Sequence, residues 1–121
     1  MPLNGAKVGV LGVAFKANVG DARNAPAAEV VAELGRRGAI VTYHDPHVAR
    51  FNDAAGAALT SQPLDDLLGA SDALVALVGH AAIDWARVYD AATVVVDTVN
   101  SSAGHTLKPR QVLLLGAGWK S

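Results

Sequence analysis

The sequence predicts a single α/β domain with a Rossmann-like, doubly wound and mainly parallel sheet. Three observations support this fold class. Short apolar runs alternate with segments of helical periodicity along the 121 residues. The runs are rich in Val and Leu without polar alternation, which indicates strands buried on both faces. The chain length suits one domain, and 51% apolar with 17% charged residues is typical of a globular protein.

The N-terminal third predicts the first strand–helix–strand unit. Residues 7–13 are expected to form a buried strand and residues 24–37 a helix whose first residue can cap it. Pro26 suits the first helical turn, and Gly38 suits the C′ position after the helix. Residues 39–44 form the second predicted strand, which stops at an Asp-Pro pair.

The remaining two-thirds of the chain continue the alternation. The predicted elements are a short weak helix at 48–55, a short strand at 58–60, helical turns at 63–68, a strand at 73–78, a helix at 83–89, and strands at 93–97 and 111–115. Such an order predicts a parallel sheet covered on both faces, with ligands bound outside the carboxyl ends of its strands. Four loops should lie at that edge: residues 14–24, 45–48, 79–82 and 97–104.

Composition excludes several kinds of protein. Ten basic and 11 acidic residues, with no basic run longer than two, argue against a nucleic-acid surface. The absence of cysteine excludes a disulfide, a thiolate metal site and a thiol nucleophile within this chain. Uncharged stretches reach 11 residues, which is too short for a membrane span. We see no secretory signal, so the expected location is the cytoplasm, with no membrane partner.

The loop after the first strand holds the main candidate site. Lys16 and Arg23 flank a turn before the predicted helix N-terminus, where free N–H groups favour an anion. The alternative is a surface loop in which Asp21 pairs with one of these cations. Gly9 and Gly12 lack the G-x-G-x-x-G spacing, so a glycine cradle for a dinucleotide is not expected here.

Polar residues after the other strands leave similar alternatives. Asp45 is either a ribose-binding acid or, as we favour, an ordinary turn residue. His80 either makes a hydrogen bond to a ligand or, as we slightly favour, is a partly exposed loop histidine. Asp97 is expected to accept backbone N–H bonds and fix its loop. The four histidines have no i, i+4 spacing, so no metal site is expected, and we assign no catalytic residue.

The stretch LGVAFKANVGDARNAPAAEVVAELGRRGAIVTYHDPHV resembles the C-terminal, UDP-binding domain of the UDP-glucose/GDP-mannose dehydrogenase family. That family carries a G-x-x-F-K…D-x-R-x-S/A-P loop, a helix, and a strand ending in D-P. The segments VGHAAIDW, VVVDTVN and LLLGAGWKS also resemble family motifs. The matching loop and strand-end residues are Gly12, Phe15, Lys16, Asp21, Arg23, Pro26, Asp45 and Pro46.

The resemblance implies an NAD⁺-dependent oxidation of a nucleotide sugar at its 6-hydroxyl, through a cysteine thioester, in polysaccharide biosynthesis. It implies that residues 1–121 correspond to the C-terminal domain only, without the N-terminal NAD domain and the central catalytic region. The start MPLNG then looks like a domain boundary or a truncated gene product. In this interpretation Phe15, Lys16 and His80 bind the UDP-sugar, and Arg23 contacts the substrate or, as we favour, the NAD across the gap between domains.

Two departures and one alternative accompany the resemblance. Val99 stands where many members have an arginine near the substrate phosphate, and Ala25 replaces a serine. YHDPHV and HAAIDWARV look closer to the UDP-N-acetylhexosamine 6-dehydrogenase branch than to UDP-glucose enzymes. The alternative is a stand-alone, non-catalytic domain that binds or senses a nucleotide sugar. Homodimer formation stays open.

Overall fold

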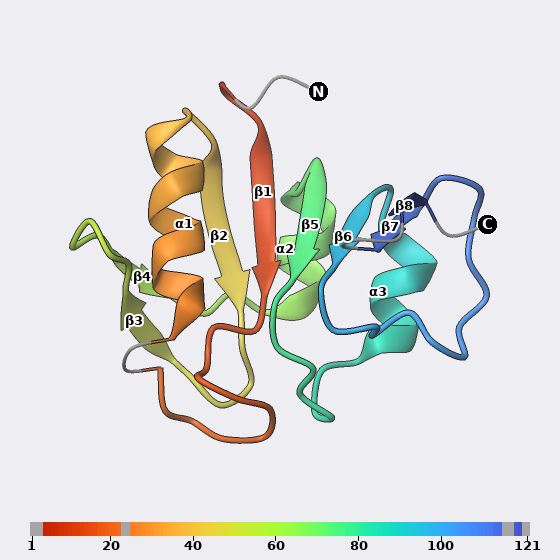
Figure 1. Cartoon of the computed structure of the whole chain (residues 1–121), viewed down its shortest axis with the longest axis horizontal. Coiled ribbons are helices and arrows are strands. Elements are labelled where there is room, and N and C mark those ends of the chain that lie inside the picture. The colour runs from red at the N-terminus through yellow and green to blue at the C-terminus, as the bar shows by residue number, and fades with distance from the viewer. Residues whose placement is uncertain (1–3, 23–24, 115–117, 120–121) are drawn as a thin grey trace.

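The computed structural model describes residues 4–22, 25–114 and 118–119. Its main sheet has six strands in the order β2-β1-β5-β6-β7-β8 (Figure 1). The first four neighbouring pairs in this order are parallel, and only β7 and β8 pair antiparallel. The strands of this sheet are β1 (Lys7–Leu11), β2 (Ile40–His44), β5 (Ala73–Ala76), β6 (Val95–Asp97), β7 (Val112–Leu114) and β8 (Gly118–Trp119).

The strand order reverses next to β1. The chain passes from β1 outward to β2, and later enters β5 on the opposite side of β1. This arrangement creates a topological switch point at the carboxyl ends of β1 and β5, which lie on the same edge of the sheet (Figure 1). The predicted α/β fold with a mainly parallel sheet is therefore confirmed.

Helices cover both faces of the sheet. One buried cluster joins α1 (Pro26–Arg36) to Val10 of β1 and Tyr43 of β2. The other joins α2 (Leu64–Ala70) and α3 (Trp85–Ala91) to the side chains on the opposite face. Members of this second cluster include Leu11, Leu67, Leu74, Ala76, Val88, Val95 and Val112. Consecutive residues of β1 thus enter opposite cores, as its unbroken apolar sequence predicts.

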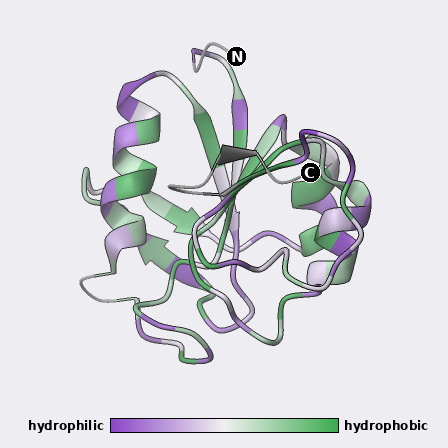
Figure 2. Cartoon of the chain, turned by 45° about the vertical axis from the view of Figure 1, so that its right-hand side comes forward, coloured by the Kyte–Doolittle hydropathy of each residue, from purple (hydrophilic) through white to green (hydrophobic). Residues whose placement is uncertain are grey.

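The two ends and the buried side of α1 follow from its sequence. Hydrophilic and hydrophobic residues recur along it (Figure 2), and Val31 lies in the core. Pro26 occupies the first position, as predicted, but the N-cap is Ala25, without a side-chain cap. At the other end Gly38 has φ 90°, and its N–H bonds to the Gly35 carbonyl in a Schellman motif.

The helix predicted at residues 48–55 is wrong. The structure has a β-hairpin there, with β3 (Arg50–Asn52) antiparallel to β4 (Ala58–Thr60). Phe51 is buried and packs edge-on against Tyr43, with 5.0 Å between ring centroids. Asp53 accepts N–H bonds from Ala55 and Ala57 and so closes the turn. Tertiary packing and a turn acid override the helix propensity of the alanines.

The other predicted elements are present, with strands that are as long as predicted or shorter and with shifted helix bounds. The strand predicted at 58–60 is confirmed as β4, and the helices predicted at 63–68 and 83–89 begin one or two residues later. The strand predicted at 111–115 is β7, and its final residue lies outside the described residues. β8 was not predicted. No helix in the described part of the chain has the length and apolarity needed to cross a membrane.

Candidate functional site

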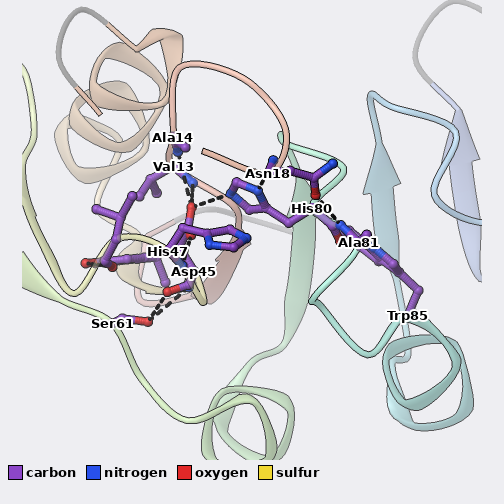
Figure 3. A network of polar contacts seen from close by, with 11 residues as sticks. Val13, Ala14, Asn18, Asp45, His47, Ser61, His80, Ala81 and Trp85 are labelled. Atoms are coloured by element: carbon purple, nitrogen blue, oxygen red, sulfur yellow. Dashed lines mark hydrogen bonds and ion pairs between the residues drawn. The ribbon is translucent and has the colours of Figure 1, made fainter. Parts of the chain in front are cut away.

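Loops from three parallel strands meet at the topological switch point (Figure 3). The described part of the loop after β1 is residues 12–22, the turn after β2 begins at Asp45, and the loop after β5 contains His80. These segments are far apart in the sequence but are joined by hydrogen bonds. The structure therefore brings three of the four predicted edge loops into direct contact.

Asp45 lies at the centre of this network. Its Oδ2 accepts the backbone N–H groups of Val13 (2.8 Å) and Ala14 (3.2 Å), and its Oδ1 accepts the His47 N–H (2.8 Å). Its backbone N–H and carbonyl both bond to the Ser61 hydroxyl. Only 3% of Asp45 is exposed. The turn interpretation of Asp45 is confirmed by the His47 bond, and its carboxylate faces the protein rather than a ligand.

The charge of Asp45 also acts on its own strand. Tyr43 is buried and donates its hydroxyl to the Val48 carbonyl (2.9 Å). Burial, together with the nearby Asp45 carboxylate, raises the pKa of Tyr43 to about 12. Tyr43 therefore remains a neutral hydrogen-bond donor at physiological pH and fixes the turn that follows β2.

His80 is fully buried, so its interpretation as a partly exposed loop histidine is wrong. Its Nε2 lies 2.9 Å from the Asp45 Oδ2, and its Nδ1 accepts the Asn18 N–H at 2.8 Å. The His47 ring packs edge-on against it, with 4.7 Å between centroids. Both ring nitrogens have protein partners. A direct hydrogen bond from His80 to a substrate stays a prediction and would require one of these bonds to open.

Asn18 and Trp85 complete the network, and the sequence reasoning did not single out either for this role. Asn18 adopts a left-handed conformation, φ 64°, and its Oδ1 accepts the Ala81 N–H (2.8 Å). Trp85 donates its indole N–H to the His80 carbonyl (2.9 Å). The available signal was the residue type, because asparagine is the non-glycine residue most tolerant of left-handed backbone.

Phe15 and Lys16 project from the same loop towards solvent. Phe15 is 58% exposed, which is unusual for a phenylalanine, while its N–H bonds to the Asp21 carbonyl (2.6 Å). Lys16 is exposed and has no ion pair among the described residues. Arg23, the predicted cofactor contact, lies outside the described residues. The loop thus exposes an apolar ring beside a cation, while its backbone is hydrogen-bonded to the buried Asp45 and His80.

The glycines of the opening motif serve packing rather than phosphate binding. A Cβ on Gly9 would lie 2.5 Å from the Ser71 Oγ and 2.7 Å from the Leu74 Cδ2. Gly12 has φ +86°, and a Cβ there would lie 2.6 Å from the Val78 Cβ. Both glycines are buried against the chain itself. The residues at this loop therefore do not fit the cradle in which dinucleotide-binding folds hold a pyrophosphate.

Asp97 organises the fourth edge loop. Its Oδ1 accepts the Val99 and Ser101 N–H groups and the Ser101 hydroxyl, and its Oδ2 accepts the Ser102 N–H. Burial opposes ionisation of Asp97, but hydrogen bonds from the backbones of Ser102, Ser101 and Val99 outweigh it and lower its pKa. The predicted structural role is confirmed. Val99, at the position of the family arginine, is 39% exposed.

The described residues hold no metal-binding group of three or more His, Cys, Asp or Glu side chains. Every buried side-chain nitrogen or oxygen among them has a hydrogen-bond partner. The network at the switch point is therefore internally complete. Phe15 and Lys16 are exposed on the loop, whereas Asp45 and His80 are buried.

The fold and this loop define an α/β domain that exposes an aromatic ring and a lysine at its switch point. A protein-family model for the UDP binding domain of the UDP-glucose/GDP-mannose dehydrogenase family matches residues 9–103. The chain therefore belongs to this family, as its loop motif predicts. The match includes all four edge loops except the last residue of the fourth.

Known relatives agree with this assignment. The chain is 32% identical over 74 residues to a UDP-N-acetyl-D-mannosamine dehydrogenase of Methanococcus maripaludis. The aligned segment covers 61% of this chain and 16% of that protein. It superposes on an NDP-N-acetyl-D-galactosaminuronic acid dehydrogenase of Methanosarcina mazei with a TM-score of 0.70 and 26% identity. That match covers 93% of this chain and 24% of the other.

A third relative is a UDP-glucose dehydrogenase of Pyrobaculum islandicum, with a TM-score of 0.62 and 26% identity over 98% of this chain and 27% of the other. The chain thus spans about a quarter or less of the length of these relatives.

Proposed function

We propose that this chain is the nucleotide-sugar-binding domain of an NAD-dependent nucleotide-sugar 6-dehydrogenase, which oxidises the sugar 6-hydroxyl to a carboxylate. Family membership and the named dehydrogenase relatives support this proposal. The observation that carries it is the loop of residues 12–22, which presents exposed Phe15 and Lys16 at the switch point. Ligands of open α/β sheets bind at this place.

The two exposed side chains suit a nucleoside diphosphate in different ways. The Lys16 ammonium supplies a point charge for the diphosphate, with no carboxylate competitor among the described residues. The Phe15 ring supplies an apolar face for the less polar part of the ligand. Val99 adds apolar surface instead of the second cation that many family members place there. We expect this domain to bind the diphosphate through fewer charges than those members do.

The chemical step requires groups that this chain lacks. The implied oxidation proceeds through a thioester, and the sequence contains no cysteine. NAD would accept the electrons as hydride, but Gly9 and Gly12 of the first loop are packed against Ser71, Leu74 and Val78 and leave no cradle for its pyrophosphate. We therefore assign NAD binding and the nucleophile to an N-terminal and a central domain outside residues 1–121. Arg23 is proposed to contact NAD across the gap between domains.

A stand-alone domain that binds a nucleotide sugar without catalysis is the second candidate, favoured by the missing cysteine. Both candidates predict UDP binding by the loop and no NADH formation by this chain alone. They differ when the missing domains are supplied as a separate polypeptide from a related dehydrogenase. Restored NADH formation with a UDP-sugar supports the enzyme domain. Binding of UDP without any restored oxidation supports the stand-alone domain.

Substitution of Lys16 by alanine tests the shared element of both candidates. Loss of one charge-assisted phosphate contact should cost about 1.5–3 kcal/mol, or about 10- to 150-fold in UDP affinity. Stability should change by less than about 1 kcal/mol, because the lysine is exposed. UDP titration followed by NMR measures even millimolar binding. The matched control is Lys7→Ala, at the amino end of β1 on the opposite edge of the sheet.

The Lys7→Ala protein should bind UDP like the parent chain. Equal UDP affinities for the parent chain, Lys16→Ala and Lys7→Ala would show that the loop is only a solvated surface.

A further inference from the structure

We propose that His80 is a positioning residue, which holds the loop of Phe15 and Lys16 in place by accepting the Asn18 N–H while Asp45 fixes its ring. This inference assigns His80 a role different from direct substrate contact. Its consequence for UDP rests on the proposed function, but the anchoring itself can be measured without any ligand.

The hydrogen-bond partners determine which nitrogen carries the proton. A backbone amide can only donate, so the His80 Nδ1, 2.8 Å from the Asn18 nitrogen, must be the unprotonated acceptor. The Nε2 then carries the proton and donates to the Asp45 Oδ2 at 2.9 Å. The ring is fully buried, so no water replaces either partner. Asp45 thereby selects the tautomer that can receive the loop.

The contact between the loop and His80 is reciprocal. The Asn18 N–H bonds to the His80 ring, and the Asn18 Oδ1 accepts the N–H of Ala81, the next residue along. These two bonds connect positions 62 and 63 residues apart. Asn18 holds a left-handed conformation, φ 64°, which the two bonds stabilise. Asn18 is two residues from Lys16, so its position directly limits where the ammonium can reach.

The other attachments of the loop lie elsewhere. The Val13 and Ala14 N–H groups bond to Asp45 at the start of the loop. The Phe15 N–H bonds to Asp21 and closes the loop on itself without attaching it to the domain. In the described part of the chain, the two hydrogen bonds of Asn18 join the middle of the loop to the segment that follows β5.

Two substitutions separate anchoring from core packing. Asparagine at position 80 can place its amide oxygen near the original Nδ1 and accept the Asn18 N–H, but it does not reach Asp45. Glutamine can place its amide nitrogen near the original Nε2 and donate to Asp45, but it leaves the Asn18 N–H without an acceptor. His80→Asn therefore retains the loop anchor, whereas His80→Gln retains the link within the core.

Amide hydrogen exchange measured by NMR gives the first readout. In His80→Gln, Asn18 should exchange at least about fivefold faster relative to Val10 of the core, since one net hydrogen bond of about 1 kcal/mol is lost. In His80→Asn, the Asn18 to Val10 ratio should stay within about twofold of the parent chain. If His80 only stabilised the core, Asn18 and Val10 would exchange faster together in each variant, and the Asn18 to Val10 ratio would not distinguish the two variants. Unchanged Asn18 protection in His80→Gln would overturn the proposal.

UDP binding gives the second readout and separates this proposal from the proposed function. The His80→Asn variant should bind UDP more tightly than His80→Gln because it keeps the acceptor for the Asn18 N–H, although Asp45 loses a hydrogen-bond donor in it. If the parent chain does not bind UDP, the proposed function fails for this chain and the exchange ratio still decides the positioning role. If UDP binds equally to both variants, the anchor does not serve the ligand and the proposed consequence for UDP is overturned, whereas the exchange ratio decides the anchoring itself.

A third measurement applies if the variants do not fold. In the parent chain, a scalar coupling across the hydrogen bond should connect the Asn18 amide nitrogen to the His80 Nδ1. Detection of this coupling supports the anchor and identifies the tautomer. A protonated His80 Nδ1 in the folded chain, with no coupling to Asn18, would overturn it.

Discussion

Replacing Asp97 by asparagine should destabilise the domain by about 2–4 kcal/mol. The side chain is fully buried, and its two oxygens accept four hydrogen bonds from residues 99, 101 and 102. Asparagine has almost the same shape but offers one oxygen and one amide group. With its oxygen in the place of Oδ1, its amide faces the Ser102 N–H, and two donors meet where a 3.0 Å hydrogen bond had been.

The magnitude follows from two contributions. An unsatisfied donor at a site with 1% exposure costs about 1–3 kcal/mol. The three bonds to Oδ1 change from charged to neutral acceptors, and each loses up to about 1 kcal/mol. These three losses are not additive because the bonds share one oxygen. In a domain of 121 residues, 2–4 kcal/mol lowers Tm by roughly 8–16 °C.

Thermal and urea denaturation monitored by circular dichroism measure this change. The matched control is Asp53→Asn, because Asp53 accepts both of its turn N–H bonds through one oxygen and its hydrogen bonds are exposed. The asparagine oxygen can keep both bonds, so the control should lose less than about 1 kcal/mol. Equal losses for the two variants would contradict the hydrogen-bond argument.

The pH dependence provides an independent check on Asp97. Folding lowers its pKa below the ordinary 3.8, so the folded state binds this proton less well than the unfolded state. Its stabilisation is therefore fully present above pH 3.8 and is lost as pH falls through the lower folded-state pKa. The stability difference between the parent chain and Asp97→Asn should shrink in that acid range. A difference that stays constant down to the acid transition would refute the assigned cause.

Two further predictions concern backbone and core. Gly12→Ala should lower the free energy of unfolding by roughly 2–4 kcal/mol, because φ +86° is strained for alanine and the Cβ would lie 2.6 Å from the Val78 Cβ. Gly35→Ala, inside α1 with no heavy atom within 4 Å, should instead raise it by up to about 1 kcal/mol. Urea denaturation should therefore give stability changes of opposite sign for the two variants, and equal signs would contradict this reasoning. Val95→Asp should lose several kcal/mol, because Val95 is fully buried in β6 between β5 and β7; an unchanged Tm would show that this strand is not central.

The sequence predicted the framework because the framework follows local rules. Unbroken apolar runs mark β1, β5 and β6, and Pro26 and Gly38 mark the ends of α1. The same rules failed at residues 48–55, where alanines favour a helix but Phe51 finds a partner in Tyr43 and Asp53 closes a hairpin turn. Asp97 was predictable because its donors follow it within five residues.

The interior of the site was not predictable in the same way. His80 was expected at the surface because loop histidines usually lie there, yet it is fully buried between Asn18 and Asp45. Each of these contacts joins residues 35 or more positions apart, and no local pattern specifies such a pairing. Lys16 was found from its place in the charged loop and Phe15 through the family motif, and the structure adds their exposure at the switch point.

The distance in sequence between Asn18 and His80 also sets an order of events during folding. When only the first βαβ unit has left the ribosome, the loop of residues 12–22 and Asp45 are present, but His80, the acceptor of the Asn18 N–H, is not. The loop can adopt its final conformation only after β5 has been added beside β1, since closing 62 residues of chain precedes the bond. We therefore expect contacts at Asn18 to be absent from the folding transition state, so that their loss mainly accelerates unfolding and leaves the folding rate unchanged.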